Sequence, residues 1–220
     1  MSIYYQDDLV TLYHGDCREI TDWLDADVLV TDPPYGISWK IGNNPKRLSW
    51  AHDGIANDSD TLVRDDALAA WGSRPALAFG SWSAAAPSLR RQTLIWQKPI
   101  DAGVVGSTTG YRTDTELIFM LGDWPKVPSR YSSVLVTGSN KNAYLRPGMG
   151  HPHAKPVGLL EVLIDRCPPG AIADPFAGSG STLIAAKNLG RRAIGVELDE
   201  RYCEIAAKRL TQDTLFGGAA

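Results

Sequence analysis

Residues 171–182 read AIADPFAGSGST, a short apolar run followed by a turn of glycine and other small residues. The residues from Ser181 to Leu189 then have the apolar spacing of a helix, and a second apolar run follows from Arg192 to Val196. A glycine-rich turn between a strand and a helix presents backbone N–H groups and the positive end of the helix dipole to a ligand. The stretch therefore predicts a β-turn-α-β unit with a binding site at the carboxyl edge of a parallel sheet.

The rest of the chain repeats this alternation of strands and helices. The run from Ile95 to Leu121 holds two strands with no helix between them, which predicts an antiparallel pair at one edge of the sheet. We therefore expect an α/β fold: a single domain over residues 1–220, built on one doubly wound, mostly parallel seven-stranded sheet. The expected strands are 9–13, 27–31, 76–80, 93–97, 115–121, 171–173 and 192–196, and the expected helices are 60–71, 157–167, 181–189 and 200–210.

A second motif, DPPY at residues 32–35, directly follows the expected strand 27–31 and so lies at the same edge of the sheet. Pro33 and Pro34 fix φ and donate no backbone hydrogen bond, so the segment offers only acceptors. Such a site suits the exocyclic amino group of adenine or cytosine. Asp32 and the carbonyl of Pro33 can accept its two N–H bonds, and Tyr35 can stack on a base swung out of a duplex. Residues 32–35 are therefore predicted to be catalytic in an attack of this amino group on a methyl group.

Glu197 adds a second signal to the glycine-rich turn. It ends the apolar run that follows the turn, where an acid can bind the two hydroxyls of a ribose. Leu183 stands where a full dinucleotide fingerprint has its third glycine, and no lysine follows as in a phosphate-binding loop. The pattern predicts a nucleoside-containing cofactor, with Asp174 free to pair with a cationic amino group.

Charge is distributed unevenly along the chain. The net charge is −3, which is unlike the strongly basic balance of many nucleic-acid-binding domains. Residues 36–50 nevertheless hold three basic residues and no acid, and residues 122–156 hold five basic residues against one acid. Because aromatic residues alternate with these charges, both stretches suit phosphates and stacked bases. We expect contact with double-stranded DNA through Lys40, Lys46, Arg47, Lys126, Arg130, Lys141 and Arg146.

Neither a membrane segment nor a metal site is expected. No apolar run approaches the roughly 18 residues that span a bilayer, and the start of the chain is acidic rather than basic. The three cysteines, Cys17, Cys167 and Cys203, have no paired spacing, and the two histidines at 151 and 153 have no third ligand nearby in the sequence. A reducing cytoplasm is the expected compartment.

Together these motifs resemble the amino-group DNA methyltransferases that use S-adenosylmethionine. DPPY at 32–35 is similar to their catalytic tetrapeptide, and DPFAGSGST at 174–182 is similar to their cofactor loop. The catalytic motif comes first in this chain, as it does in the circularly permuted beta class. Residues 151–164, which include Lys155, are similar to the helix that leads into the cofactor loop of that class.

The resemblance implies S-adenosylmethionine as the cofactor and a role for each matching position. Asp174 would bind the methionine amino group, Glu197 the ribose and Asp16 the adenine end. Lys155 would lie near the cofactor carboxylate. The other positions implied to bind the cofactor belong to the loop itself and are Phe176, Gly178, Gly180 and Thr182.

The segment available for target recognition is shorter than in many members of that family. A mobile substrate loop over about 36–57 and an insertion over about 122–150 would have to read the DNA. A short or degenerate target is therefore expected. A homodimer and a cognate nuclease on a separate chain stay open, and the resemblance implies a bacterial or phage-encoded enzyme.

Adenine N6 is the predicted acceptor, because in the resembling family a tetrapeptide that begins with Asp favours adenine over cytosine N4. Cytosine N4 stays the first alternative, and an amino group of RNA or protein is the next. Cytosine C5 methylation would need a cysteine nucleophile near the catalytic strand, where the sequence has none. An NAD-dependent oxidoreductase, or a DNA-binding module without activity, would leave one of the two motifs without a role.

Overall fold

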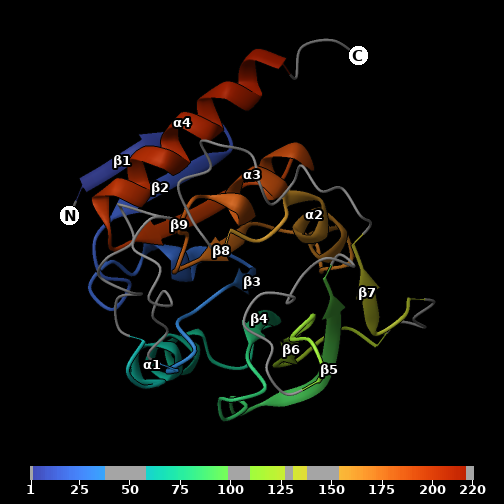
Figure 1. The fold of residues 1–220 in the computed structure, drawn as a ribbon. Helices are drawn as coiled ribbons and strands as arrows, with labels where there is room; N and C mark the ends of the chain where they lie inside the picture. The colour runs from blue at the N-terminus through green and yellow to red at the C-terminus, as the bar shows by residue number, and fades with distance from the viewer. Residues whose placement is uncertain (1, 38–57, 99–109, 127–130, 138–153, 217–220) are drawn as a thin grey trace.

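The computed structural model describes residues 2–37, 58–98, 110–126, 131–137 and 154–216 (Figure 1). Most of the predicted substrate loop, 38–57, therefore lies outside the described residues. The predicted target-recognition insertion, 122–150, lies only partly within them.

One β-sheet runs through the molecule. Its nine described strands are β1 (Ser2–Gln6), β2 (Val10–His14), β3 (Val28–Thr31), β4 (Ala76–Gly80), β5 (Arg90–Gln97), β6 (Thr115–Leu121), β7 (Val134–Val136), β8 (Ile172–Asp174) and β9 (Ala193–Glu197). They lie in the order β1-β2-β9-β8-β3-β4-β6-β5-β7. The middle of the sheet, from β2 to β4, is parallel. Strand β6 runs antiparallel to both β4 and β5, and β1 runs antiparallel to β2 at one edge.

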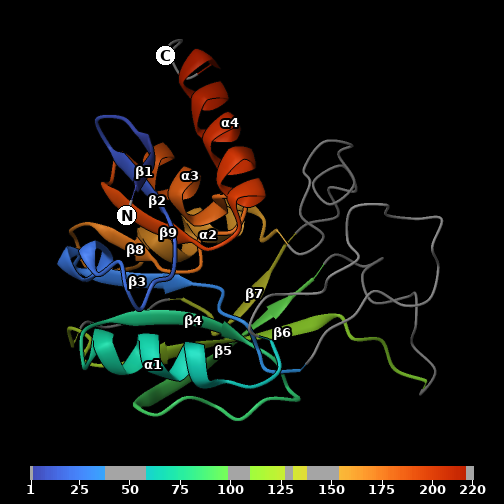
Figure 2. The same ribbon diagram turned by 90° about the vertical axis from the view of Figure 1, so that its left-hand side faces the viewer.

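Helices cover both faces of this sheet. They are α1 (Leu62–Trp71), α2 (Val157–Asp165), α3 (Ser181–Asn188), α4 (Glu200–Phe216) and the short 3-10 helix η1 (Asp22–Asp25). Figures 1 and 2 show α2, α3 and α4 on one face and α1 on the other. A cluster of buried side chains fills each interface, with Leu160, Leu183 and Leu210 on the first face and Trp23 and Trp71 on the second. The predicted doubly wound α/β class is confirmed.

No helix in the described ranges combines the length and the apolar character that crossing a membrane requires.

The described residues form nine strands rather than the expected seven. All seven predicted strands are present, and β1 and β7 are additional strands at the two edges. None of the five residues of β1 is fully buried, and β7 has three residues of which Leu135 alone is buried. The apolar runs of both strands are only three residues long, Ile3 to Tyr5 in β1 and Val134 to Val136 in β7, so each is a weak signal of a strand in the sequence. Because β7 pairs with β5, the predicted antiparallel pair β5–β6 lies one strand in from the edge.

The parallel register brings the functional segments together at one edge. Leu29 of β3 pairs with Ala173 of β8, and Thr31 pairs with Ala78 of β4. The segments that follow β3, β4, β8 and β9 therefore leave the sheet side by side. The antiparallel strand β6 begins at this same edge, since its Leu117 pairs with Gly80 at the end of β4.

Candidate active site

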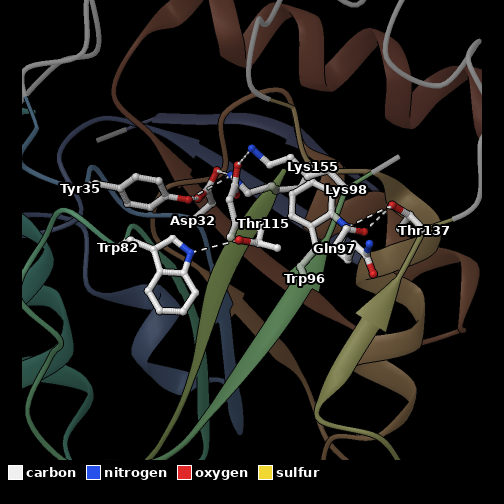
Figure 3. Close-up of polar contacts among 10 residues, drawn as sticks. Asp32, Tyr35, Trp82, Trp96, Gln97, Lys98, Thr115, Thr137 and Lys155 are labelled. Carbon is white, nitrogen blue, oxygen red and sulfur yellow. Dashed lines mark hydrogen bonds and ion pairs between the residues drawn. The ribbon is translucent and has the colours of Figure 1, made fainter. Parts of the chain in front are cut away.

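Asp32 leaves the carboxyl end of β3 with its carboxylate held from two directions (Figure 3). The hydroxyl of Tyr35 donates to Oδ1 at 2.6 Å, and the ammonium Nζ of Lys155 donates to Oδ2 at 2.6 Å. Lys155 lies far from Asp32 in the sequence, just before α2. Its Nζ also donates to the Tyr35 hydroxyl at 3.2 Å. Pro33 and Pro34 stiffen the intervening backbone. The orientation of the carboxylate is therefore set within the protein itself.

Lys155 also belongs to a row of four charges that alternate in sign: Lys98, Glu116, Lys155 and Asp32, called the charge row below. Glu116, near the start of β6, places Oε1 2.6 Å from Nζ of Lys98 and Oε2 3.3 Å from Nζ of Lys155. This buried Oε2 has no hydrogen-bond partner among the described residues, although it faces the Lys155 ammonium. With two positive and two negative members, the charge row has no net charge.

Contacts within the charge row shift the pKa values of Lys155 and Glu116, and the row also shifts the pKa of the adjacent Tyr35. Burial alone would lower the pKa of Lys155, but Asp32 and Glu116 outweigh it and raise that pKa. Burial also opposes the ionisation of Glu116, yet Lys155 and Lys98 lower its pKa. For Tyr35, burial and the charge of Asp32 both raise the pKa well above its ordinary value. At neutral pH, Lys155 is therefore a cation and Tyr35 a neutral hydrogen-bond donor.

Asp174 ends β8 as a buried acid with 2% of its surface exposed. Its Oδ1 accepts hydrogen bonds from Oγ1 of Thr31 at 2.7 Å and from the backbone N–H of Phe176 at 3.2 Å. Burial raises the pKa of this carboxyl to about 7, although Thr31, Thr182 and Phe176 all donate hydrogen bonds that favour its ionised form. Asp174 thus exchanges its proton near neutral pH.

Glu197 connects the glycine-rich turn to the end of β9. The N–H of Gly178 donates to its Oε2 at 2.7 Å, and the N–H of Asp199 donates to its Oε1 at 2.8 Å. Gly178 has a φ of +50°, a conformation that glycine adopts without strain. Because a carboxylate oxygen has a second lone pair, Glu197 can still accept two further hydroxyl groups. Burial raises its pKa in spite of the bonds from the two amides.

Gly180 and Thr182 contact the parts of the protein that support the turn on the side away from the cavity. Gly180 has a φ of +80°, and a Cβ at this position would lie 2.9 Å from Cβ of Ala206 on α4. A side chain there would push the turn away from α4. Thr182, in the first turn of α3, is buried and donates to the carboxyl of Asp174.

A cavity of about 610 Å³ opens where these segments meet, a size typical of small-molecule sites. Asp16, whose carboxylate pairs with Arg18 at 2.6 Å, lines it beside Glu197. The Arg18 guanidinium lowers the pKa of Asp16. The structure brings these predicted site residues to the cavity wall: Asp16, Asp32, Pro33, Pro34, Tyr35, Lys155, Phe176, Gly178 and Glu197. Asp174, Gly180 and Thr182 do not line it.

The residues predicted to contact DNA lie mostly outside the described part of the chain. Lys126 is described and is exposed. The others, Lys40, Lys46, Arg47, Arg130, Lys141 and Arg146, fall outside the described ranges. Within those ranges, no three His, Cys, Asp or Glu side chains gather as a metal site.

Four residues of the site were not predicted. Lys98 and Glu116 are charged residues at the ends of apolar strands, a signal that could have marked them. Asp58 accepts a hydrogen bond from the N–H of Gly36 at 2.8 Å and so holds the backbone beyond residues 32–35. Trp82 lines the cavity after β4. Asp58 and Trp82 stand in stretches without a periodic pattern, so nothing in the sequence distinguished them.

Comparison with known proteins agrees with this geometry. A family model described as a DNA methylase of the N6/N4 type matches residues 124–208. YubD of Escherichia coli (strain K12), whose name describes it as a methylase, is 30% identical to this chain over 94% of the chain and 93% of its own length. The chain belongs to the N6/N4 family of DNA methyltransferases. The resemblance expected from its two motifs is thereby confirmed.

Solved structures share the fold of this DNA methyltransferase. The M1.HpyAVI–SAM complex superposes with a TM-score of 0.60 at 23% identity, covering 92% of this chain and 100% of that one. The PvuII DNA methyltransferase, which is cytosine-N4-specific, superposes with a TM-score of 0.64 at 14% identity, covering 99% of this chain and 96% of that one. At these identities the likeness concerns the fold.

Proposed function

We propose that this DNA methyltransferase transfers a methyl group from S-adenosylmethionine to the N6 amino group of an adenine extruded from double-stranded DNA. The observation that carries the proposal is the position of the Asp32 carboxylate. It lines the same cavity as the glycine-rich turn and is fixed there by Tyr35 and Lys155. A substrate whose amino group receives the methyl group requires a fixed hydrogen-bond acceptor beside the turn that would bind the nucleoside of the cofactor.

The residues around the turn fit S-adenosylmethionine. Glu197 keeps lone pairs for two ribose hydroxyls, and Asp16 lines the cavity on the same side. Asp174 does not line the cavity, but it is a buried acid at the start of the turn, and a cationic amino group that reached it would favour its ionised form. When bound, the cofactor supplies a methyl group on a positively charged sulfur.

Lys155 has three partners within the protein. Its ammonium donates to the Asp32 carboxylate and the Tyr35 hydroxyl, and it faces Oε2 of Glu116 at 3.3 Å. To bind the carboxylate of the cofactor, the role that the resemblance implies for this residue, one of its three N–H donors would have to leave its partner in the protein.

The chemistry follows from the acceptors at residues 32–35. Asp32 accepts one N–H of the adenine amino group, and the carbonyl of Pro33 accepts the other. These bonds draw the nitrogen lone pair out of conjugation with the ring, which makes the nitrogen pyramidal and nucleophilic. With the cofactor bound, this lone pair would form the new bond to the methyl carbon, and the electron pair of the broken carbon–sulfur bond would stay on sulfur. The nitrogen then carries one proton too many, and this proton leaves to Asp32 or to water.

Cytosine N4 is the second candidate acceptor, because its amino group offers the same two N–H donors to Asp32 and Pro33. The fold is also that of a cytosine-N4-specific enzyme. We propose adenine as the acceptor because the tetrapeptide begins with Asp32, and in the resembling family such a tetrapeptide favours adenine.

The test is to incubate the purified protein with S-adenosylmethionine and unmethylated bacterial DNA, and to analyse the digested nucleosides by mass spectrometry. We expect N6-methyladenine, and none from the Asp32→Ala variant. N4-methylcytosine would keep the mechanism and change the base. Absence of any methylated nucleoside from a protein that binds the cofactor would reject DNA as the substrate.

A further inference from the structure

Trp82 stands out among the tryptophans of this DNA methyltransferase. Its side chain is 61% exposed, whereas the other tryptophans in the described residues are buried or half-buried. It is the second residue after β4 and lines the cavity together with Asp32 and Tyr35. A large flat ring is thus presented to the site rather than to the core.

The indole is anchored by its polar edge. Its Nε1–H donates to Oγ1 of Thr115 at 3.2 Å, and Thr115 begins β6, the antiparallel neighbour of β4. Because the N–H is already satisfied within the protein, Trp82 has no polar group left for a ligand. What it offers is an aromatic face, which suits stacking rather than hydrogen bonding.

The order of the strands decides which ligand this face meets. Glu197 ends β9, Asp32 follows β3 and Trp82 follows β4, and these strands lie in the order β9-β8-β3-β4. Trp82 and the predicted ribose-binding acid are therefore on opposite sides of Asp32. Figure 3 shows the rings of Trp82 and Tyr35 on the same side of Asp32. A planar group with its amino group at Asp32 would lie within reach of both rings.

We propose that Trp82 is a binding residue for the extruded target base and stacks on it. The proposal deepens the proposed function and rests on it. Stacking depends on the aromatic face alone and accepts any base, so Trp82 contributes affinity while residues 32–35 select the amino group. A purine presents a larger face than a pyrimidine, so this contact favours adenine over cytosine.

The test compares the wild type with Trp82→Ala and Trp82→Phe on the unmethylated DNA that reports methylation in the nucleoside assay. Removal of a stacking aromatic should lower kcat/KM for DNA by about 10- to 100-fold in Trp82→Ala, with a smaller loss in Trp82→Phe, which keeps a ring. The affinity for S-adenosylmethionine, measured by calorimetry, should not change. Leu62→Ala is the matched control, because Leu62 is 64% exposed on α1 and does not line the cavity.

Three results would overturn the stacking role. They are a Trp82→Ala variant within twofold of the wild type, an equal loss in Leu62→Ala, and a parallel loss of cofactor affinity. Each of these requires an active wild type, so each leaves the proposed function standing. A wild type that methylates no DNA overturns the proposed function and the stacking role together.

Discussion

Asp174 should make the protein less stable as the pH rises toward neutrality. Burial raises the pKa of its carboxyl to about 7 in the folded protein, against an ordinary value of 3.8. An acid whose folded-state pKa is raised contributes its full stability below the unfolded-state pKa. That contribution is lost as the pH rises to the folded-state pKa, and it is constant above. For these two values, linkage gives a loss of about 2 kcal/mol between about pH 5.5 and 8.5.

The Asp174→Asn variant isolates this effect. Asn keeps an oxygen that accepts hydrogen bonds from Thr31 and Phe176, but it cannot ionise. The free energy of unfolding of both proteins can be measured by urea denaturation between about pH 5.5 and 8.5. Over this range the wild type should lose about 2 kcal/mol relative to the variant. Asp123→Asn, which removes an exposed charge, is the control. Parallel pH dependence in the wild type and Asp174→Asn would refute the reasoning.

The carboxyl group of Asp174 should also couple cofactor binding to the release of a proton. A cationic amino group beside Asp174 would favour its ionised form, so S-adenosylmethionine should displace a proton when it binds near pH 6. Calorimetry in two buffers of different ionisation enthalpy counts that proton. We expect release from the wild type and none from Asp174→Asn. A wild type that binds the cofactor without proton release would place the amino group elsewhere.

Three further substitutions test the rest of the site. Asp32→Ala should abolish methyl transfer and leave cofactor affinity intact by calorimetry; loss of both would contradict its role as acceptor. Gly178→Val puts a β-branched side chain at a φ of +50° in the cavity wall, so cofactor affinity should fall by about tenfold or more, and unchanged affinity would remove the turn from the site. Lys155→Met leaves two carboxylates without their shared cation and should lower the free energy of unfolding by about 3–5 kcal/mol in urea denaturation; a loss below about 1 kcal/mol would mean that the ion pairs contribute little.

Strands and turns of the central sheet were predictable because each is marked by residues that are adjacent in the sequence. The buried strands β3 and β8 are continuous apolar runs, and each is followed by a motif whose residue types restrict the backbone. The parallel alternation then placed Asp32 and Glu197 at one edge without any knowledge of contacts. Strands β1 and β7 were missed because their apolar runs are three residues long and no such motif follows them.

Contacts between distant parts of the chain were not predictable in this way. Lys155 lies 123 positions after Asp32, and their ion pair depends on where the segment before α2 lies relative to the end of β3. The resemblance implied that Lys155 lies near the cofactor carboxylate, but no motif indicated its contact with Glu116. Trp82 follows no pattern, and its hydrogen bond to Thr115 depends on the pairing of β4 with β6.

The alternation of sign in the charge row restricts how this enzyme can vary. Replacing Lys98, Glu116, Lys155 or Asp32 singly removes an oppositely charged partner from each neighbour of that residue in a largely buried site. Changes at these four positions are therefore expected to be tolerated in pairs, such as a joint loss of Glu116 and Lys98. Exposed positions such as Lys126 carry no such coupling and can change one at a time. We therefore expect sequence drift to change positions that are predicted to contact DNA, such as Lys126, sooner than the charge row.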